Sequence, residues 1–209
     1  MEENIGPRWL EWAREIQALS QTGLTFSENE YQTQRYLRLM AIASEIVQSH
    51  AKLPQEPLLK NFTAQPGYAT PKVDVRGAVV RDGRILLVQE RADGRWSMPG
   101  GWADVGSRPS EMVVREVREE SGFEVVPRKL VGVYDANRGG HPMQFFHAYK
   151  VIWLCDITGG DASPSNETLA AAFFPFDALP ELSSARTHPR HLDEVQAHLA
   201  DPSRQAAFD

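Results

Sequence analysis

Three glutamates lie close together in a segment that carries the start and stop signals of a helix: Glu116, Glu119 and Glu120. Their spacing of i, i+3 and i+4 places all three carboxylates on one helical face. Pro109 suits the first turn of such a helix, and Gly122 suits a left-handed stop just beyond its last residue. The sequence therefore predicts a short helix with a carboxylate face.

This carboxylate face has two interpretations. Like charges at these spacings destabilise a bare helix by about 0.2–0.5 kcal/mol per pair, so a solvated acidic face is one of them. A hard cation such as Mg²⁺ or Mn²⁺ reverses that effect, because it takes oxygen ligands and keeps positions for water and substrate phosphates. The preceding turn Pro99-Gly100-Gly101 can bring backbone close to a ligand, which favours the metal site.

Residues 101–123 as a whole resemble the Nudix box of the Nudix hydrolases. The residues that carry the match are Gly101, Arg115, Glu116, Val117, Glu119, Glu120, Gly122 and Phe123. One position departs from the pattern, because Ser107 stands where the box normally has a glutamate that supports the metal site or the box arginine. We expect Glu111, one helical turn later, to substitute for it by pairing with Arg115.

The resemblance extends over most of the chain. Residues 72–180 resemble a whole Nudix domain. The segments Trp9-Leu10-Glu11-Trp12-Ala13 and Gly67 to Ala78 are similar to a subgroup of bacterial Nudix enzymes with an added helical domain, described as CDP-choline or ADP-ribose-type pyrophosphatases. The implied fold is α/β, with a mixed β-sheet sandwiched by helices and a small N-terminal α-helical domain in front of it. We expect domains at residues 1–66 and 67–209.

Composition limits the partners. The formal net charge is −6, which provides no basic field for a stable nucleic-acid partner. Cys155 is the single cysteine of the sequence, which excludes an internal disulfide, and its apolar neighbours predict a buried thiol. The N-terminal residues do not resemble a signal peptide. The apolar runs are shorter than the ~18 residues that a membrane span needs, so we expect a cytoplasmic enzyme.

Two helices are predicted before residue 66. Apolar residues at helical spacing mark residues 7–21, and a capping-box pattern at Ser27 and Glu30 starts a second helix over 28–50. A short helix near Pro57–Phe62 and a linker follow. The second helix has more apolar surface than one partner helix can bury, so it packs on the Nudix domain or on a second subunit. We favour a homodimer through these helices.

Strand patterns begin at residue 73. The predicted strands are 73–80, 85–90, 96–98, 125–135, 145–156 and 170–176, and a final helix is predicted over 189–199. Asp82-Gly83 predicts a hairpin between the first two strands, and Asp93-Gly94 predicts another turn.

The Nudix resemblance implies roles for the box residues. Glu116, Glu119 and Glu120 would hold the metal, with the backbone carbonyl of Gly101 as a further ligand. Arg115 would pair with Glu111 or Glu119 and hold the carboxylates in place. A glutamate on a loop between late strands often acts as general base, and Glu167 is that candidate here, with Glu120 as its rival.

Four further residues are candidates for substrate binding: Arg76, Arg91, Trp96 and His147. Three of them also have a structural interpretation: a surface ion pair for Arg76, a core position for Trp96 and a hydrogen-bonded structural role for His147. The same two interpretations, a phosphate or ligand contact and a hydrogen-bonded structural role, apply to His141.

The resemblance implies hydrolysis of a phosphoanhydride with Mg²⁺ or Mn²⁺. The expected substrate is a nucleoside diphosphate linked to a group X, with CDP-choline as first choice and ADP-ribose as second, giving a nucleoside monophosphate and phospho-X. The alternatives are a (d)NTP pyrophosphohydrolase or RNA 5′-end hydrolase, and an inactive nucleotide-binding sensor.

Overall fold

The structure is a computed structural model of the 209-residue chain, and it describes residues 7–51, 67–104, 106–137 and 147–209. The chain divides into two compact units. The predicted short helix near Pro57–Phe62, His141 and the start of the strand predicted over 145–156 lie outside the described residues.

The N-terminal unit is a pair of helices, α1 (Arg8–Thr25) and α2 (Glu30–Ala51). Both predicted helices are confirmed, although α1 runs four residues beyond the predicted end at residue 21. The pair encloses a small apolar core formed by Leu10, Ala13, Met40, Ala43 and Val47.

The start of α2 corrects one prediction. Its first turn is capped by Asn29, whose Oδ1 accepts a hydrogen bond from the Gln32 N–H at 2.9 Å. The Ser27 hydroxyl instead donates to the Gly23 carbonyl at 2.8 Å. The capping box predicted from Ser27 and Glu30 is therefore wrong, because Asn29 is a better-placed acceptor for the free N–H groups of the first turn.

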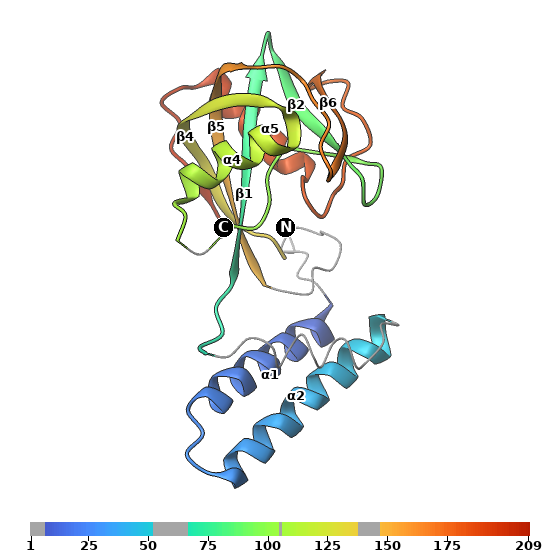
Figure 1. The fold of residues 1–209 in the computed structure, drawn as a ribbon, viewed down its shortest axis with the longest axis vertical. Coiled ribbons are helices and arrows are strands. Elements are labelled where there is room, and N and C mark those ends of the chain that lie inside the picture. The colour runs from blue at the N-terminus through green and yellow to red at the C-terminus, as the bar shows by residue number, and fades with distance from the viewer. Residues whose placement is uncertain (1–6, 52–66, 105, 138–146) are drawn as a thin grey trace. The chain divides into compact units, whose positions relative to one another are not determined.

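The second unit contains a mixed sheet whose strands follow the order β3-β2-β1-β5-β4-β7, with β6 paired to β2 (Figure 1). Its strands are β1 (Lys72–Arg81), β2 (Arg84–Glu90), β3 (Trp96–Ser97), β4 (Phe123–Asp135), β5 (Ala148–Gly160), β6 (Thr168–Pro175) and β7 (Ala207–Phe208). β1 and β5 pair in parallel, whereas β1 with β2 and β4 with β5 are antiparallel.

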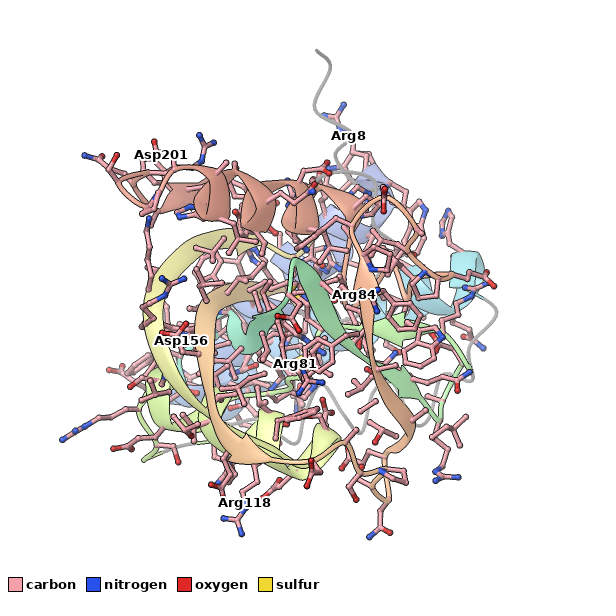
Figure 2. The ribbon with its side chains drawn as sticks, turned by 90° about the horizontal axis from the view of Figure 1, so that it is seen from above. Arg8, Arg81, Arg84, Arg118, Asp156 and Asp201 are labelled. Atoms are coloured by element: carbon pink, nitrogen blue, oxygen red, sulfur yellow. The ribbon has the colours of Figure 1, made fainter. Side chains whose placement is uncertain are left out.

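Two helices cover this sheet, α4 (Pro109–Ser121) and α5 (Pro189–Ala200). Figure 2 shows them on opposite sides of the strands, with Arg118 on the α4 side and Asp201 just past the end of α5. One apolar cluster joins Val75, Val79 and Leu86 to Met112, Val113 and Val117 of α4. The other joins Ala78, Ile85 and Leu87 to Leu192 and Val195 of α5. Alternate strand residues thus serve opposite layers, which is the expected period of a buried strand.

Local turn chemistry matches the predictions. Asp82 and Gly83 both have positive φ, at 51° and 72°, as the tight hairpin between β1 and β2 requires. Gly94 also has a positive φ of 71°, and its N–H donates to the Glu90 carbonyl at 2.9 Å. The sheet with its two helical layers confirms the α/β Nudix fold. Within the described residues, none of the helices has the length and hydropathy to cross a membrane.

Candidate active site

The glycine turn before α4 is fixed to the first strand. The Val75 N–H donates to the Gly101 carbonyl at 2.8 Å, and the Gly77 N–H donates to the Pro99 carbonyl at 2.9 Å. Gly100 has a φ of 145°, and a Cβ there would lie 2.0 Å from the Val75 carbonyl oxygen. Glycine is therefore required at this close approach of the turn to β1.

Helix α4 begins and ends where its sequence signals predict. Pro109 occupies its first turn, and Gly122 follows its last residue with a φ of 79° and an N–H bond to the Arg118 carbonyl. Glu111 accepts a hydrogen bond from the Arg108 N–H at 3.2 Å, which closes the first turn. Val113 and Val117 face the sheet, whereas Glu116, Glu119 and Glu120 line the adjoining pocket.

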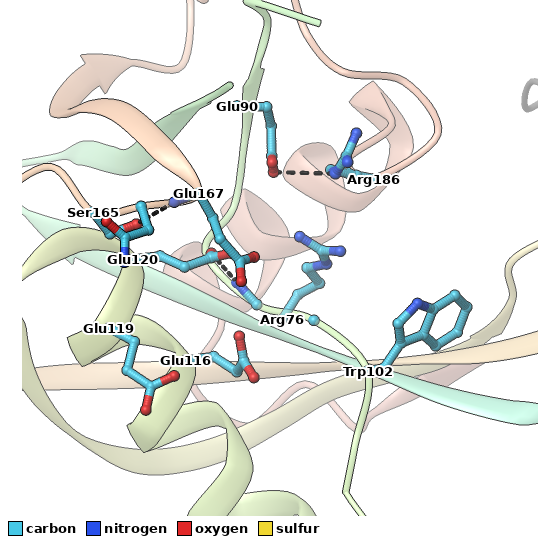
Figure 3. A pocket seen from close by; sticks show the side chains of 12 residues that line it. Arg76, Glu90, Trp102, Glu116, Glu119, Glu120, Ser165, Glu167 and Arg186 are labelled. Carbon is cyan, nitrogen blue, oxygen red and sulfur yellow. Dashed lines mark hydrogen bonds and ion pairs between the residues drawn. The ribbon is translucent and has the colours of Figure 1, made fainter. Parts of the chain in front are cut away.

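A pocket of about 650 Å³ lies between the glycine turn, α4 and the loops that flank β6, a volume in the usual range for ligand sites. Twelve residues line it, shown in Figure 3: Arg76, Glu90, Gly100, Gly101, Trp102, Glu116, Glu119, Glu120, Ser165, Asn166, Glu167 and Arg186. The structure thus brings together the three box glutamates, Gly101, Glu167 and Arg76 of the predicted site.

Glu120 is the most deeply buried of the box carboxylates. Its Oε2 accepts a hydrogen bond from the Gly100 N–H at 2.7 Å, and Glu120 as a whole is 6% exposed. Burial is the main cause that raises the pKa of Glu120 to about 7, against the opposing effect of Arg76. Burial, and then the charge of Glu119, also raise the pKa of Glu116. The α4 face therefore holds carboxylates whose negative charge is poorly compensated.

These carboxylates fit a hard cation by their chemistry. All are oxygen donors, and a cation among them would offset the repulsion that raises the pKa of Glu116. As the side chains stand, no group of three or more histidine, cysteine or acidic residues is placed to hold a metal in the described part of the chain. Figure 3 shows Glu119 directed away from Glu120, as consecutive residues of a helix are.

Arg115 does not pair with Glu111, so that prediction is wrong. Its Nη2 donates to the Asp104 carboxylate and contacts the Met112 sulfur at 2.9 Å. Glu111 is directed to Arg108 at the start of α4 instead. The box glutamate position is occupied by Ser107, and the carboxylate that reaches Arg115 comes instead from Asp104, three residues earlier in the loop.

Arg91 holds the loop that carries Glu167 and does not line the pocket. Its Nε donates to the Asn166 carbonyl at 3.0 Å, and its Nη2 donates to the Ser165 and Thr168 carbonyls at 3.3 Å. The Arg91 N–H donates to the Glu167 carbonyl at 2.9 Å. Arg91 therefore acts on this pocket through the backbone of its loop.

The remaining substrate-binding candidates have different environments. Arg76 lines the pocket but is 4% exposed, and it donates to both oxygens of Asp74 and to the Met98 carbonyl. Trp96 packs edge-on against Phe174, with ring centroids 4.7 Å apart, and is not among the lining residues. His147 is exposed just before β5 and is not among them either.

Several lining residues were missed by sequence reasoning. Trp102 directly follows the glycine turn, and 49% of it is exposed beside the pocket. Its place next to Gly101 was a usable signal. Glu90 and Arg186 had no such signal, because their arrival at the pocket depends on how β2 and the segment after β6 pack.

Comparison with known families assigns both parts of the chain. A model described as UDP-X-like, N-terminal oligomerisation domain matches residues 7–62. A NUDIX domain model matches residues 71–195, which is more than half of the chain.

Two similar proteins cover the chain almost from end to end. The Bacillus subtilis (strain 168) protein named "Putative ADP-ribose pyrophosphatase YjhB" is 41% identical over 205 residues, which is 98% of this chain and 99% of its relative. The solved structure of a UDP-X diphosphatase matches with a TM-score of 0.63 and 28% identity over 97% of this chain and 98% of the other. An ADP-ribose pyrophosphatase structure from Streptococcus suis 89-1591 has a TM-score of 0.62 and 37% identity, covering 67% of this chain and all of its own. The chain therefore belongs to the Nudix hydrolase family, as a pyrophosphohydrolase with a UDP-X-like N-terminal oligomerisation domain.

Proposed function

We propose that this enzyme cleaves the diphosphate bond of a nucleoside diphosphate linked to a group X, with ADP-ribose as the preferred substrate and CDP-choline as the second candidate. The products are a nucleoside monophosphate and phospho-X. One observation carries the proposal: a single pocket contains the box glutamates of α4, the glycine turn and the carboxylate of Glu167. ADP-ribose takes first place over CDP-choline because two of the similar proteins are named for it.

The proposed metal ligands are Glu116, Glu119 and Glu120, with the Gly101 carbonyl as a further oxygen. Nudix hydrolases generally use divalent metal ions such as Mg²⁺. Such an ion, when bound, neutralises charge on the diphosphate oxygens and lowers the pKa of a water molecule. Mg²⁺ suits this donor set better than zinc, since the set has only oxygen atoms.

The protein's own part in the chemistry is positioning and proton transfer. We assign the general base to Glu167, because the Glu120 carboxylate already accepts a hydrogen bond from Gly100. The loop bonds from Arg91 hold Glu167 at the pocket without touching its carboxylate. Arg115, bound to Asp104, is assigned as a positioning residue that fixes the turn against α4.

A substrate screen tests the proposal directly. Purified protein is incubated with ADP-ribose, CDP-choline and a deoxynucleoside triphosphate, each with Mg²⁺, with Mn²⁺ or with excess EDTA, and the products are resolved by chromatography. We expect AMP and ribose 5-phosphate from ADP-ribose, and no turnover in EDTA. Preferred release of pyrophosphate from the triphosphate would replace this proposal with the triphosphate alternative, and binding without any turnover would indicate a sensor.

The base assignment has a matched control. Glu167→Gln should lower kcat by about 100-fold, within the usual range for loss of a general base, with a smaller change in KM. Glu181→Gln alters an exposed glutamate that pairs with Arg95, and it should leave kcat unchanged. A Glu167→Gln enzyme with wild-type kcat would return the role to Glu120.

We also propose a homodimer formed by the N-terminal helices, with domain boundaries at residues 1–66 and 67–209. Large apolar residues of α1 and α2 are exposed, including Trp12 at 51%, Leu19 at 62% and Tyr31 at 63%. Surfaces of that kind usually mark an interface, and a two-fold dimer is the commonest solution. Light scattering coupled to gel filtration should give twice the chain mass, and the mass of one chain at micromolar concentration would contradict the dimer.

A further inference from the structure

Arg186 is the more accessible of the two arginines that line the pocket. Its side chain is 33% exposed, whereas the Arg76 side chain is 5% exposed and donates to Asp74 and the Met98 carbonyl. In Figure 3, Arg186 lies with Glu90 on the side of the pocket away from Glu116 and Glu119. Arg186 therefore offers positive charge to the pocket at a distance from the carboxylates of α4.

The guanidinium of Arg186 is only partly engaged. Its Nε lies 3.2 Å from the Glu90 carboxylate, and its Nη1 donates to the Ser183 hydroxyl at 3.2 Å. Nη1 also lies 3.8 Å from the Asp93 carboxylate. No hydrogen bond of Nη2 is found among the described residues. Glu90 is itself 5% exposed and accepts a hydrogen bond from the Ser97 hydroxyl at 2.6 Å, so it holds the Arg186 head group from a fixed position.

The backbone of Arg186 is fixed by a buried pair of opposite charges. The Lys150 ammonium donates to the Arg186 carbonyl at 2.7 Å and to the Asp74 carboxylate at 2.9 Å. Lys150 is 1% exposed and Asp74 is 3% exposed. Burial lowers the pKa of Lys150 to about 8, although Asp74 opposes that change. A buried charge pair is weak evidence for a stabilising role, so a role in placing Arg186 is a better account of it.

The turn around Arg186 is also tied to the glycine turn. The Thr187 hydroxyl accepts a hydrogen bond from the Met98 N–H at 2.8 Å, directly before Pro99. The Ser183 N–H donates to the Trp96 carbonyl at 2.8 Å. The turn that carries Arg186 is therefore ordered on folding, which lowers the entropy cost of placing this arginine when an anion binds.

We propose that Arg186 is a substrate-binding residue that donates a charge-assisted hydrogen bond to a phosphate oxygen of the substrate, and that Lys150 and Asp74 position it. This inference rests on the proposed function, because it concerns the same pocket and the same diphosphate substrate. An arginine suits this task, since its planar fork of donors matches phosphate geometry. Its charge also offsets the repulsion between the substrate and the neighbouring Glu90.

Kinetics of matched variants test the role of Arg186. Arg186→Gln should raise KM for ADP-ribose by about 10-fold or more, with a smaller change in kcat. Arg186→Lys keeps the charge and should recover part of the loss. Arg84→Gln removes an exposed arginine outside the pocket and should match the wild type. Unchanged KM in Arg186→Gln, or an equal rise in Arg84→Gln, would overturn the assignment.

Binding without turnover separates this inference from the substrate proposal. Inorganic pyrophosphate is titrated by calorimetry at low ionic strength in EDTA into wild type, Arg186→Gln and Arg84→Gln. Binding by wild type and Arg84→Gln that is lost in Arg186→Gln supports the inference even if ADP-ribose is not hydrolysed. Equal binding by all three proteins, or no binding by the wild type, would overturn it.

The positioning role of Lys150 is tested by a double-mutant cycle. Lys150→Met should raise KM, as Arg186→Gln does. The KM of the double variant should be no higher than that of Arg186→Gln alone, because both changes remove the same contact between Arg186 and the substrate. Thermal unfolding shows whether each variant folds. If Lys150→Met does not fold, Lys150→Arg takes its place in the cycle. Additive effects on KM would show that Lys150 acts independently of Arg186.

Discussion

Replacing Gly77 by alanine is expected to displace the helix that carries the box glutamates. Gly77 lies in β1 under α4, and a Cβ at this position would be 2.5 Å from Cγ2 of Val117 and 3.2 Å from Cγ2 of Val113. Ordinary contacts of this kind are 3.4–4 Å, so α4 must move by roughly 1 Å to relieve the closer one. The Gly77 N–H also donates to the Pro99 carbonyl, which couples the same strain to the glycine turn.

The magnitude follows from the cost of overpacking. Forcing an extra methyl group into a filled core costs about 1–3 kcal/mol, which is roughly 5- to 150-fold in the folding equilibrium. Val117→Ala removes two buried methyl groups and should cost about 1.6 kcal/mol by itself. In the Gly77→Ala/Val117→Ala double variant the 2.5 Å contact no longer exists, because Cγ2 of Val117 is absent. The double variant should therefore be about 1–3 kcal/mol more stable than the sum of the single changes predicts.

Urea unfolding followed by tryptophan fluorescence measures these stabilities, and kcat/KM for ADP-ribose measures the effect on the pocket. A displacement of this size can reduce catalysis by up to about 100-fold. We expect Gly77→Ala to lose activity and the double variant to regain part of it. Strictly additive stabilities, or a Gly77→Ala protein with wild-type stability and activity, would refute the close packing of α4 on β1.

Three further predictions concern single side chains. Asp104→Asn should lower kcat/KM more than Glu111→Gln does, since Arg115 bonds to Asp104, and the reverse ranking in steady-state kinetics would contradict this. The exposed indole of Trp102 is expected to stack on the base, so Trp102→Ala should raise KM for nucleotide substrates by about 10-fold, whereas Trp102→Phe should keep most of the affinity. A Trp102→Ala enzyme with the KM of the wild type would exclude stacking. Burial raises the pKa of the Cys155 thiol from 9.0 to about 12. Between these pH values the unfolded chain binds fewer protons than the folded protein does, so the free energy of unfolding falls as pH rises. Cys155→Ala should therefore lose less stability than the wild type between pH 8 and pH 10 in urea unfolding, and equal losses would count against a buried thiol.

Features that depend on neighbours along the chain could be predicted from sequence. The limits of α4 follow from Pro109 and Gly122, and the hairpin after β1 follows from Asp82-Gly83. Glu116, Glu119 and Glu120 share the pocket because their helical spacing places them on one face. Signals of this kind act over a few residues, so they can be interpreted without knowledge of the sheet.

Which distant side chains meet could not be predicted from sequence, because it depends on how the strands pair and pack. The parallel register of β1 and β5 sets Asp74 opposite Lys150, and Lys150 then reaches the carbonyl of Arg186. Arg91 was a substrate candidate from sequence, but the pairing of β2 with β6 places it beside the carbonyls of the Glu167 loop. Strand order and register are set by the packing of both apolar layers at once, and a shift of one residue would turn each of these side chains to the other face.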